Sequence, residues 1–118
     1  MSETPRISPA EAHAKMTDGG FTYVDVRTED EFAAGHPKGA INVPIGDGFV
    51  AAMQSRFAKD AKIIVGCKAG GRSAKAAQAL AGAGFTNVLD QRAGWDGARG
   101  AFGEISEPGW SRLGLPTE

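Results

Sequence analysis

The sequence is poor in cysteine: Cys67 stands alone in 118 residues. One cysteine excludes a disulfide within the chain and a metal site built from cysteines alone. The two histidines, His13 and His36, do not stand at a recognisable zinc-binding spacing with it. We therefore expect neither a disulfide nor a metal ion to organise this chain.

An excess of one charge and long apolar runs are also absent. Thirteen basic and 14 acidic residues give a formal net charge of −1, so no basic field favours nucleic acid as a partner. No apolar stretch approaches the roughly 20 residues of a membrane-spanning helix. The polar segment before Pro9 lacks the basic and apolar parts of a signal peptide. These absences predict a cytoplasmic protein with no membrane partner.

The length and composition are those of one globular domain. A chain of 118 residues with 42% hydrophobic and 23% charged residues can build one core, and it is too short for two. We predict a single domain over residues 1–118, in which residues 1–6 form a flexible N-terminus.

Short apolar segments alternate with segments that begin like helices. Strands are predicted at 21–26, 39–44, 62–65 and 87–89. Helices are predicted behind capping boxes at 8–11 and 28–31, and over 49–57 and 73–83. Strands without a polar face fit a parallel sheet covered on both sides, which predicts a small doubly wound α/β domain. After Gly94 we expect irregular chain up to a short helix at 108–113.

The most informative segment is the glycine-rich loop 66–72, between a predicted strand and a predicted helix. Ligands of open α/β sheets bind beyond the carboxyl ends of the strands, where this loop lies. Cys67 is expected near a helix N-terminus, with Lys68 and Arg72 adding positive charge. Positive surroundings favour the thiolate, which is the nucleophilic form of cysteine. Cys67 is therefore the candidate nucleophile, although a buried structural cysteine is the plainer alternative.

The same loop is predicted to bind an anion through its backbone. Gly70 and Gly71 allow the chain to turn inward, so that successive N–H groups converge on one point. The planar fork of Arg72 suits an oxyanion such as a sulfonate or phosphate. Ser73 is expected to cap the following helix. The predicted binding residues are Lys68, Ala69, Gly70, Gly71, Arg72 and Ser73.

Other polar residues are assigned structural roles. Asp25 and Arg27 end a predicted strand on the ligand side, and we interpret them as an ion pair that braces the loop. His36 is interpreted as a turn residue, because a cysteine that is already a thiolate needs no base. His13, on the first predicted helix, is expected to face solvent.

The segment Cys-Lys-Ala-Gly-Gly-Arg-Ser at 67–73 resembles the active-site loop C-[RK]-x-G-x-R-[ST] of the rhodanese family. Asp-Val-Arg at 25–27, Glu-Phe at 31–32 and Gly-His at 35–36 resemble a second element of that family. Gly-Ala-Ile-Asn-Val-Pro at 39–44 resembles a third, and Gly94-Trp95 and Gly114-Leu115-Pro116 resemble its closing segments. The match covers nearly the whole chain and is most similar to single-domain thiosulfate sulfurtransferases.

The resemblance implies a five-stranded parallel sheet flanked by helices, and no metal or organic cofactor. It implies that Cys67 takes a sulfane sulfur from thiosulfate or a similar small anionic donor, as a persulfide. The sulfur would pass to cyanide or a thiol, thioredoxin included. Lys68 stands where arginine is commoner, which keeps the charge but loses the bidentate fork.

Two alternatives stay open. Phosphatases and arsenate reductases of this fold have a loop one residue longer than the four residues that separate Cys67 from Arg72. The tighter loop favours a single terminal sulfur over a phosphorus- or arsenic-centred oxyanion. A non-enzymatic sulfur-relay module, loaded by a partner protein, fits Cys67 equally well.

Overall fold

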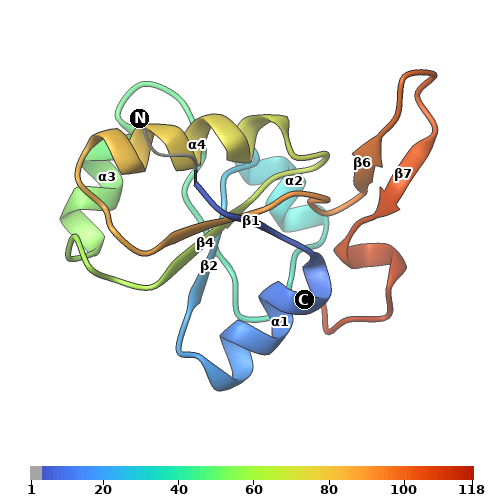
Figure 1. The fold of residues 1–118 in the computed structure, drawn as a ribbon, viewed down its shortest axis with the longest axis horizontal. Coiled ribbons are helices and arrows are strands. Elements are labelled where there is room, and N and C mark those ends of the chain that lie inside the picture. Colours follow the sequence, from blue (N-terminus) through green and yellow to red (C-terminus); the bar gives the residue numbers. More distant parts are fainter. Residues whose placement is uncertain (1–3) are drawn as a thin grey trace.

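The computed structural model of the protein describes residues 4–118 (Figure 1). Its main sheet contains β1 (Arg6–Ile7), β2 (Thr22–Asp25), β3 (Ile41–Asn42), β4 (Ile63–Gly66) and β5 (Val88–Gln91). All neighbouring strands are parallel, in the spatial order β1-β5-β4-β2-β3. The predicted α/β class with a five-stranded parallel sheet is confirmed.

Helices cover both faces of this sheet. They are α1 (Pro9–Asp18), α2 (Glu29–Ala34), α3 (Phe49–Arg56) and α4 (Gly71–Gly82). Figure 1 shows α3 and α4 above the sheet and α1 below it. Among residues 4–118, no helix has the length and apolar character needed to cross a membrane.

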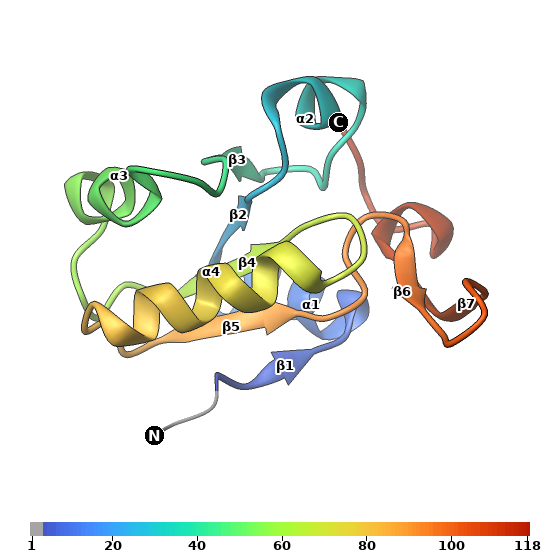
Figure 2. The ribbon, with the colours of Figure 1, turned by 90° about the horizontal axis from the view of Figure 1, so that it is seen from above.

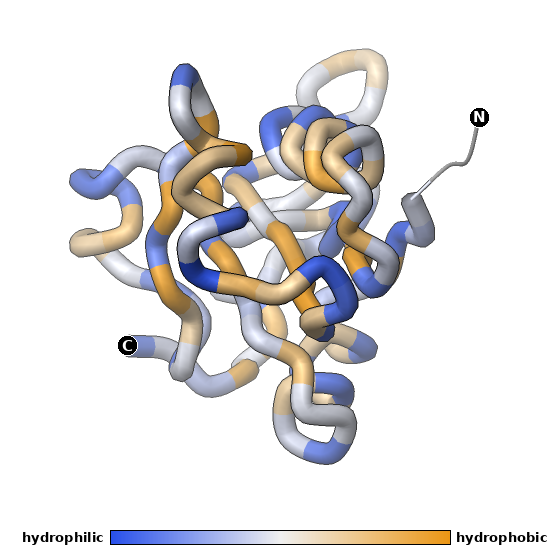
Figure 3. The backbone as a smooth tube through the Cα atoms, turned by 90° about the vertical axis from the view of Figure 1, so that its left-hand side faces the viewer, coloured by the Kyte–Doolittle hydropathy of each residue, from blue (hydrophilic) through white to orange (hydrophobic). Residues whose placement is uncertain are grey.

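Each face of the sheet has its own hydrophobic core, because successive residues of a strand point to opposite sides. Ile63 and Val65 of β4 pack with Leu80 of α4 on one face. Ile64, between them, packs on the other face in the cluster that contains Trp110. Figure 3 shows hydrophobic stretches of the chain running through the middle of the molecule.

The helix starts follow local sequence signals. Both predicted capping boxes are present, at Ser8 with Glu11 and at Thr28 with Glu31. In each box the hydroxyl accepts a hydrogen bond from the third helical N–H, and the glutamate accepts one from the backbone of the capping residue. The second box also orients Glu31, which becomes important at the candidate site.

The prediction of a flexible segment 1–6 is wrong at Arg6. Arg6 begins β1, where it pairs with Asp90 of β5, and the Pro5 carbonyl accepts a hydrogen bond from the Asp90 N–H at 2.9 Å. A two-residue edge strand has no periodicity to recognise, and its stability comes from a partner far along the chain. Residues 1–3 lie outside the described residues.

The prediction of irregular chain after Gly94 is also wrong. β6 (Gly97–Arg99) and β7 (Ile105–Pro108) form an antiparallel hairpin that projects from the body of the molecule (Figure 1). The predicted short helix is a 3-10 turn, η1 (Trp110–Arg112). Trp110 is fully buried and packs edge-on against Tyr23, with ring centroids 5.6 Å apart. This contact anchors the C-terminal segment to the sheet.

Candidate functional site

The candidate nucleophile lies directly after a buried central strand. β4 ends at Gly66, Cys67 follows, and α4 begins at Gly71, two residues earlier than predicted. Figure 2 places the β4–α4 loop at the same end of the sheet as α2 and β6. Cys67 is 3% exposed, so its side chain is almost fully buried.

Gly70 makes the closest backbone contact with the sulfur. Its N–H donates a hydrogen bond to Cys67 Sγ at 3.1 Å. Gly70 has a φ of 98°, in the left-handed region, and an added Cβ would lie 2.3 Å from the Arg92 carbonyl oxygen. Gly71 has ordinary helical geometry, and an added Cβ there meets no atom of residues 4–118 within 4 Å. The conformational need predicted for both glycines therefore applies to Gly70 alone.

The segment that follows β5 holds the loop from its other side. The Trp95 N–H donates to the Cys67 carbonyl at 2.8 Å, and the Asp96 N–H donates to the Lys68 carbonyl at 2.9 Å. Gly94 lies so close to the loop that an added Cβ would be 2.5 Å from the Lys68 carbonyl oxygen. The position of Cys67 therefore depends on a segment nearly 30 residues further along the chain, which the sequence analysis did not assign to the site.

Gln91 organises that segment and was also missed. Its side chain is fully buried, and its carbonyl oxygen accepts hydrogen bonds from the N–H groups of Ala93 and Gly94. Its amide nitrogen donates to the Tyr23 hydroxyl at 3.1 Å. A glutamine at the end of a short strand carries no sequence signal for this role, because one partner, Tyr23, lies 68 residues away and the others are backbone groups of the turn.

Asp25 and Arg27 form a buried ion pair at the end of β2. Arg27 Nη2 lies 2.6 Å from Asp25 Oδ2, and both side chains are at most 3% exposed. The same guanidinium donates to the Gly35 carbonyl at 2.7 Å and lies over the ring of Trp95, 5.2 Å from its centroid. These contacts favour the predicted bracing role, and they reach the loop through Trp95.

Arg72 was predicted to offer its fork to an oxyanion, which stays a prediction, and in the structure the fork is paired with a carboxylate. Its guanidinium donates two hydrogen bonds to the Glu31 carboxylate, at 2.7 and 3.0 Å. These hydrogen bonds from Arg72, with the backbone N–H of Thr28, lower the pKa of Glu31 to about 2. The pair joins α2 to the start of α4 beside Cys67, so the charge of Arg72 is already balanced.

The prediction that Ser73 caps α4 is wrong. The helix starts two residues before Ser73, and Gly70 occupies the capping position. Ser73 is fully buried, and its hydroxyl donates to Asp90 Oδ1 at 2.6 Å. Asp90 Oδ2 in turn accepts a hydrogen bond from Arg6 Nε at 2.8 Å. Sequence reasoning missed Asp90 and Arg6, because one lay past the end of a predicted strand and the other in a segment predicted to be flexible.

The histidines lie in structural positions. His36 stacks on Phe32, with ring centroids 3.6 Å apart, and its Nδ1 lies 2.8 Å from the Phe32 carbonyl oxygen. This agrees with its interpretation as a turn residue. His13 was expected to face solvent, but it is half-buried and packs edge-on against Trp110 at 5.8 Å. The correction follows from the C-terminal turn η1, which covers that side of α1.

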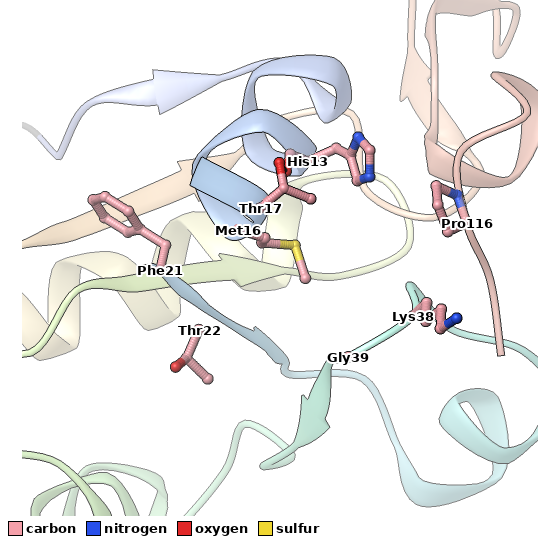
Figure 4. Close-up of a pocket in the computed structure, with 8 residues that line it drawn as sticks. All are labelled: His13, Met16, Thr17, Phe21, Thr22, Lys38, Gly39 and Pro116. Atoms are coloured by element: carbon pink, nitrogen blue, oxygen red, sulfur yellow. The ribbon is translucent and has the colours of Figure 1, made fainter. Parts of the chain in front are cut away.

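A separate pocket of about 340 Å³ lies between the end of α1, the start of β2 and the C-terminal segment (Figure 4). It is at the amino ends of the strands, whereas Cys67 follows a carboxyl end. Cys67 is not among its lining residues, so this pocket is separate from the candidate site. The lining residues are His13, Met16, Thr17, Phe21, Thr22, Lys38, Gly39 and Pro116.

Fold and loop together define a class of small α/β domains that present one cysteine on a glycine-rich turn ahead of a helix. Comparison with protein families identifies one family within this class. Residues 8–101 match the rhodanese-like domain, and the chain belongs to the rhodanese family.

Two relatives illustrate the match. The chain is 39% identical over 122 residues to thiosulfate sulfurtransferase 16, chloroplastic, of Arabidopsis thaliana, covering 95% of this chain and 91% of that protein. It is 36% identical over 108 residues to the thiosulfate sulfurtransferase GlpE of Pseudomonas entomophila, covering 91% and 96%. Two other relatives are longer, and the chain spans 57% and 56% of their lengths.

A solved structure extends the comparison to three dimensions. Rv0390 from M. tuberculosis superposes with a TM-score of 0.79 at 27% identity, covering 99% of this chain and 98% of that one. The similarity therefore includes the whole sheet and the C-terminal segment.

Proposed function

We propose that this protein is a sulfurtransferase in which Cys67 carries a sulfane sulfur as a persulfide. One observation carries the proposal: the sulfur of the single, buried cysteine accepts the Gly70 N–H at 3.1 Å, at the start of a helix. An N–H aimed at sulfur stabilises negative charge there, which a transferring sulfur needs. The names of the two full-length relatives support thiosulfate as the donor.

In the first step, the Cys67 thiolate attacks the outer sulfur of thiosulfate. A new S–S bond forms to Cys67 while the S–S bond of the donor breaks, and its electron pair leaves with sulfite. The outer sulfur of the resulting persulfide carries the negative charge. N–H groups of residues 68–73 would hold this charge, and the exposed Lys68 would attract the donor dianion.

In the second step, an acceptor thiolate or cyanide attacks the outer sulfur of the persulfide. The S–S bond to Cys67 breaks, and its electron pair returns to Cys67 as a thiolate. The cycle needs no redox cofactor, because the sulfane sulfur moves without net oxidation of the protein. A thiol acceptor such as thioredoxin and a cytoplasmic location remain predictions, as do the lack of nucleic-acid and membrane partners.

Arg72 would act differently from a free anion clamp. Because Glu31 holds both arms of its fork, Arg72 would shape the rim of the loop and offset the charge of the donor only in part. The four-residue spacing between Cys67 and Arg72 remains the argument against the phosphatase and arsenate reductase alternatives. The sulfur-relay alternative differs only in the source of sulfur.

Intact-mass spectrometry after incubation with thiosulfate tests the proposal. We expect a gain of about one sulfur atom, ~32 Da, that thiol treatment reverses. Because the chain has one cysteine, the Cys67→Ser variant is a complete control and should gain nothing. An unmodified wild-type protein would exclude thiosulfate as a donor, and loading only from a partner's persulfide would favour the sulfur-relay alternative.

A further inference from the structure

The hydroxyl proton of Ser73 has three acceptors within reach and can bind only one. Asp90 Oδ1 lies 2.6 Å from Ser73 Oγ, the Gly70 carbonyl oxygen lies at 3.3 Å, and Cys67 Sγ lies at 3.5 Å. Ser73 and Asp90 are at most 1% exposed, so water does not compete. The nearest acceptor is also a carboxylate, and charge-assisted hydrogen bonds are the strongest. The Ser73 proton therefore belongs to Asp90.

This arrangement fixes what Ser73 presents to the sulfur. With its proton at Asp90, the hydroxyl turns lone pairs toward Cys67 Sγ and can accept the S–H of a thiol. The same lone pairs oppose a thiolate. Arg6 Nε holds the other carboxylate oxygen of Asp90 at 2.8 Å, which keeps Oδ1 directed at Ser73.

We propose that Asp90 is a positioning residue that acts on Cys67 through Ser73, and that this pair opposes negative charge on Sγ, whereas the Gly70 N–H favours it. Sγ is uncharged in the thiol form of Cys67 and again in the persulfide, where the charge lies on the outer sulfur. Only the second state rests on the proposed function. The pair thus limits the reactivity of the empty cysteine without opposing the loaded one.

Other ionisable groups also surround this part of the site, and none of them changes in the variants below. They come from β1, β2 and the residues after it, α2, the loop and α4, and are Arg6, Tyr23, Asp25, Arg27, Glu31, Lys68 and Arg72.

In the Asp90→Asn variant, the Ser73 hydroxyl should accept a hydrogen bond from residue 90 instead of donating one to it. Arg6 Nε–H needs an acceptor, so the amide oxygen of the new side chain faces Arg6 and its NH₂ group faces Ser73. Ser73 then accepts from the amide, and its own proton can go to the Gly70 carbonyl oxygen or to Cys67 Sγ. A thiolate is the charged and therefore stronger of these two acceptors, so the proton goes to Sγ when Cys67 is ionised. A hydrogen bond to a charged group should raise the ratio of thiolate to thiol at neutral pH about tenfold.

The readout is the ultraviolet absorbance of the thiolate, measured as the difference from Cys67→Ser. Ser73→Ala should raise the ratio by a smaller factor, about threefold, because it removes the acceptor without adding a donor. Ser73→Thr keeps the hydroxyl and should match the wild type. Asp60→Asn, the same chemical change at an exposed residue, should also leave the ratio unchanged.

The double variant distinguishes an effect of Asp90 through the Ser73 hydroxyl from a direct electrostatic effect of the Asp90 charge on Cys67. In the Ser73→Ala background, Asp90→Asn should add nothing, because no hydroxyl remains to turn. An equal rise in both backgrounds, or no rise in either, would overturn the proposal. If circular dichroism shows that Asp90→Asn does not fold, equal ratios of thiolate to thiol in Ser73→Ala and Ser73→Thr would still overturn the proposal, because the Ser73 hydroxyl would then have no effect on Cys67. Thiosulfate is absent from these measurements, so a failure to form persulfide remains a separate result.

Discussion

Substitution by alanine should destabilise the protein at Gly70 and leave it equally or more stable at the adjacent Gly71. Gly70 has a φ of 98°, and an added Cβ would lie 2.3 Å from the Arg92 carbonyl oxygen and 3.2 Å from Arg6 Nη2. The left-handed backbone costs an alanine about 1–3 kcal/mol, and relieving the backbone contact costs a similar amount. Gly70→Ala should therefore lower the free energy of unfolding by about 3 kcal/mol, which corresponds to a fall of about 10–15 °C in Tm.

Gly71→Ala is the matched control. Gly71 is the first residue of α4, and an added Cβ meets no atom of residues 4–118 within 4 Å. Alanine restricts the unfolded chain and should leave the protein equally stable or more stable by up to about 1 kcal/mol. Denaturant unfolding of both variants measures the difference directly.

The two alanine variants should also differ in the rate at which thiosulfate loads Cys67 with sulfur. Gly70→Ala displaces the N–H that contacts Cys67 Sγ, so loading with thiosulfate should slow at least tenfold. Gly71→Ala keeps that N–H in place and should load at close to the wild-type rate. Equal stability and equal loading in the two variants would refute the assignment of Gly70 as the residue that shapes the sulfur site.

Three further outcomes are expected. Cys67→Ser should abolish sulfur transfer in a thiosulfate–cyanide assay and leave Tm nearly unchanged, because the two side chains are similar in size. Because its pKa is lowered to about 2, Glu31 stabilises the fold fully above its unfolded value near 4.5 and loses this effect as the pH falls toward 2; Glu31→Gln should flatten acid unfolding in that window, measured by circular dichroism. Arg27→Ala leaves Asp25 as a buried charge without its ion-pair partner and should lower the free energy of unfolding by about 3–5 kcal/mol in urea titrations.

Each outcome can fail in a distinct way. Transfer by Cys67→Ser would exclude a persulfide mechanism. An acid transition that Glu31→Gln leaves unaltered would mean that the pair with Arg72 does not persist in solution. A stable Arg27→Ala protein would show that Asp25 is solvated or neutral, which contradicts the buried ion pair.

Local signals were interpreted correctly from the sequence. The capping boxes at Ser8 and Thr28, and the strand, loop and helix around Cys67, depend on residues within a few positions of one another. Their hydrogen bonds form within one turn of chain, so residue type and spacing suffice to predict them.

Polar partners were interpreted less well. Ser73 was expected to cap a helix, whereas its hydroxyl donates to Asp90, and the pairing of Arg72 with Glu31 was not foreseen. Those partners lie 17 and 41 residues away, respectively, and Arg6 lies 84 residues from Asp90. Sequence pattern does not indicate which distant donors and acceptors will meet, because the order of strands in the sheet decides it.

By itself, the sequence determined the family, the α/β class and the loop that carries Cys67, since these rest on short-range spacing and on hydrophobic pattern. The tertiary structure alone decided that β1 lies beside β5, which brings Arg6 to Asp90 and Asp90 to Ser73. It also decided that the segment after β5 holds the carbonyls of Cys67 and Lys68. The physical reason is that a buried polar group must find a partner, and the packed sheet determines which partner is within reach.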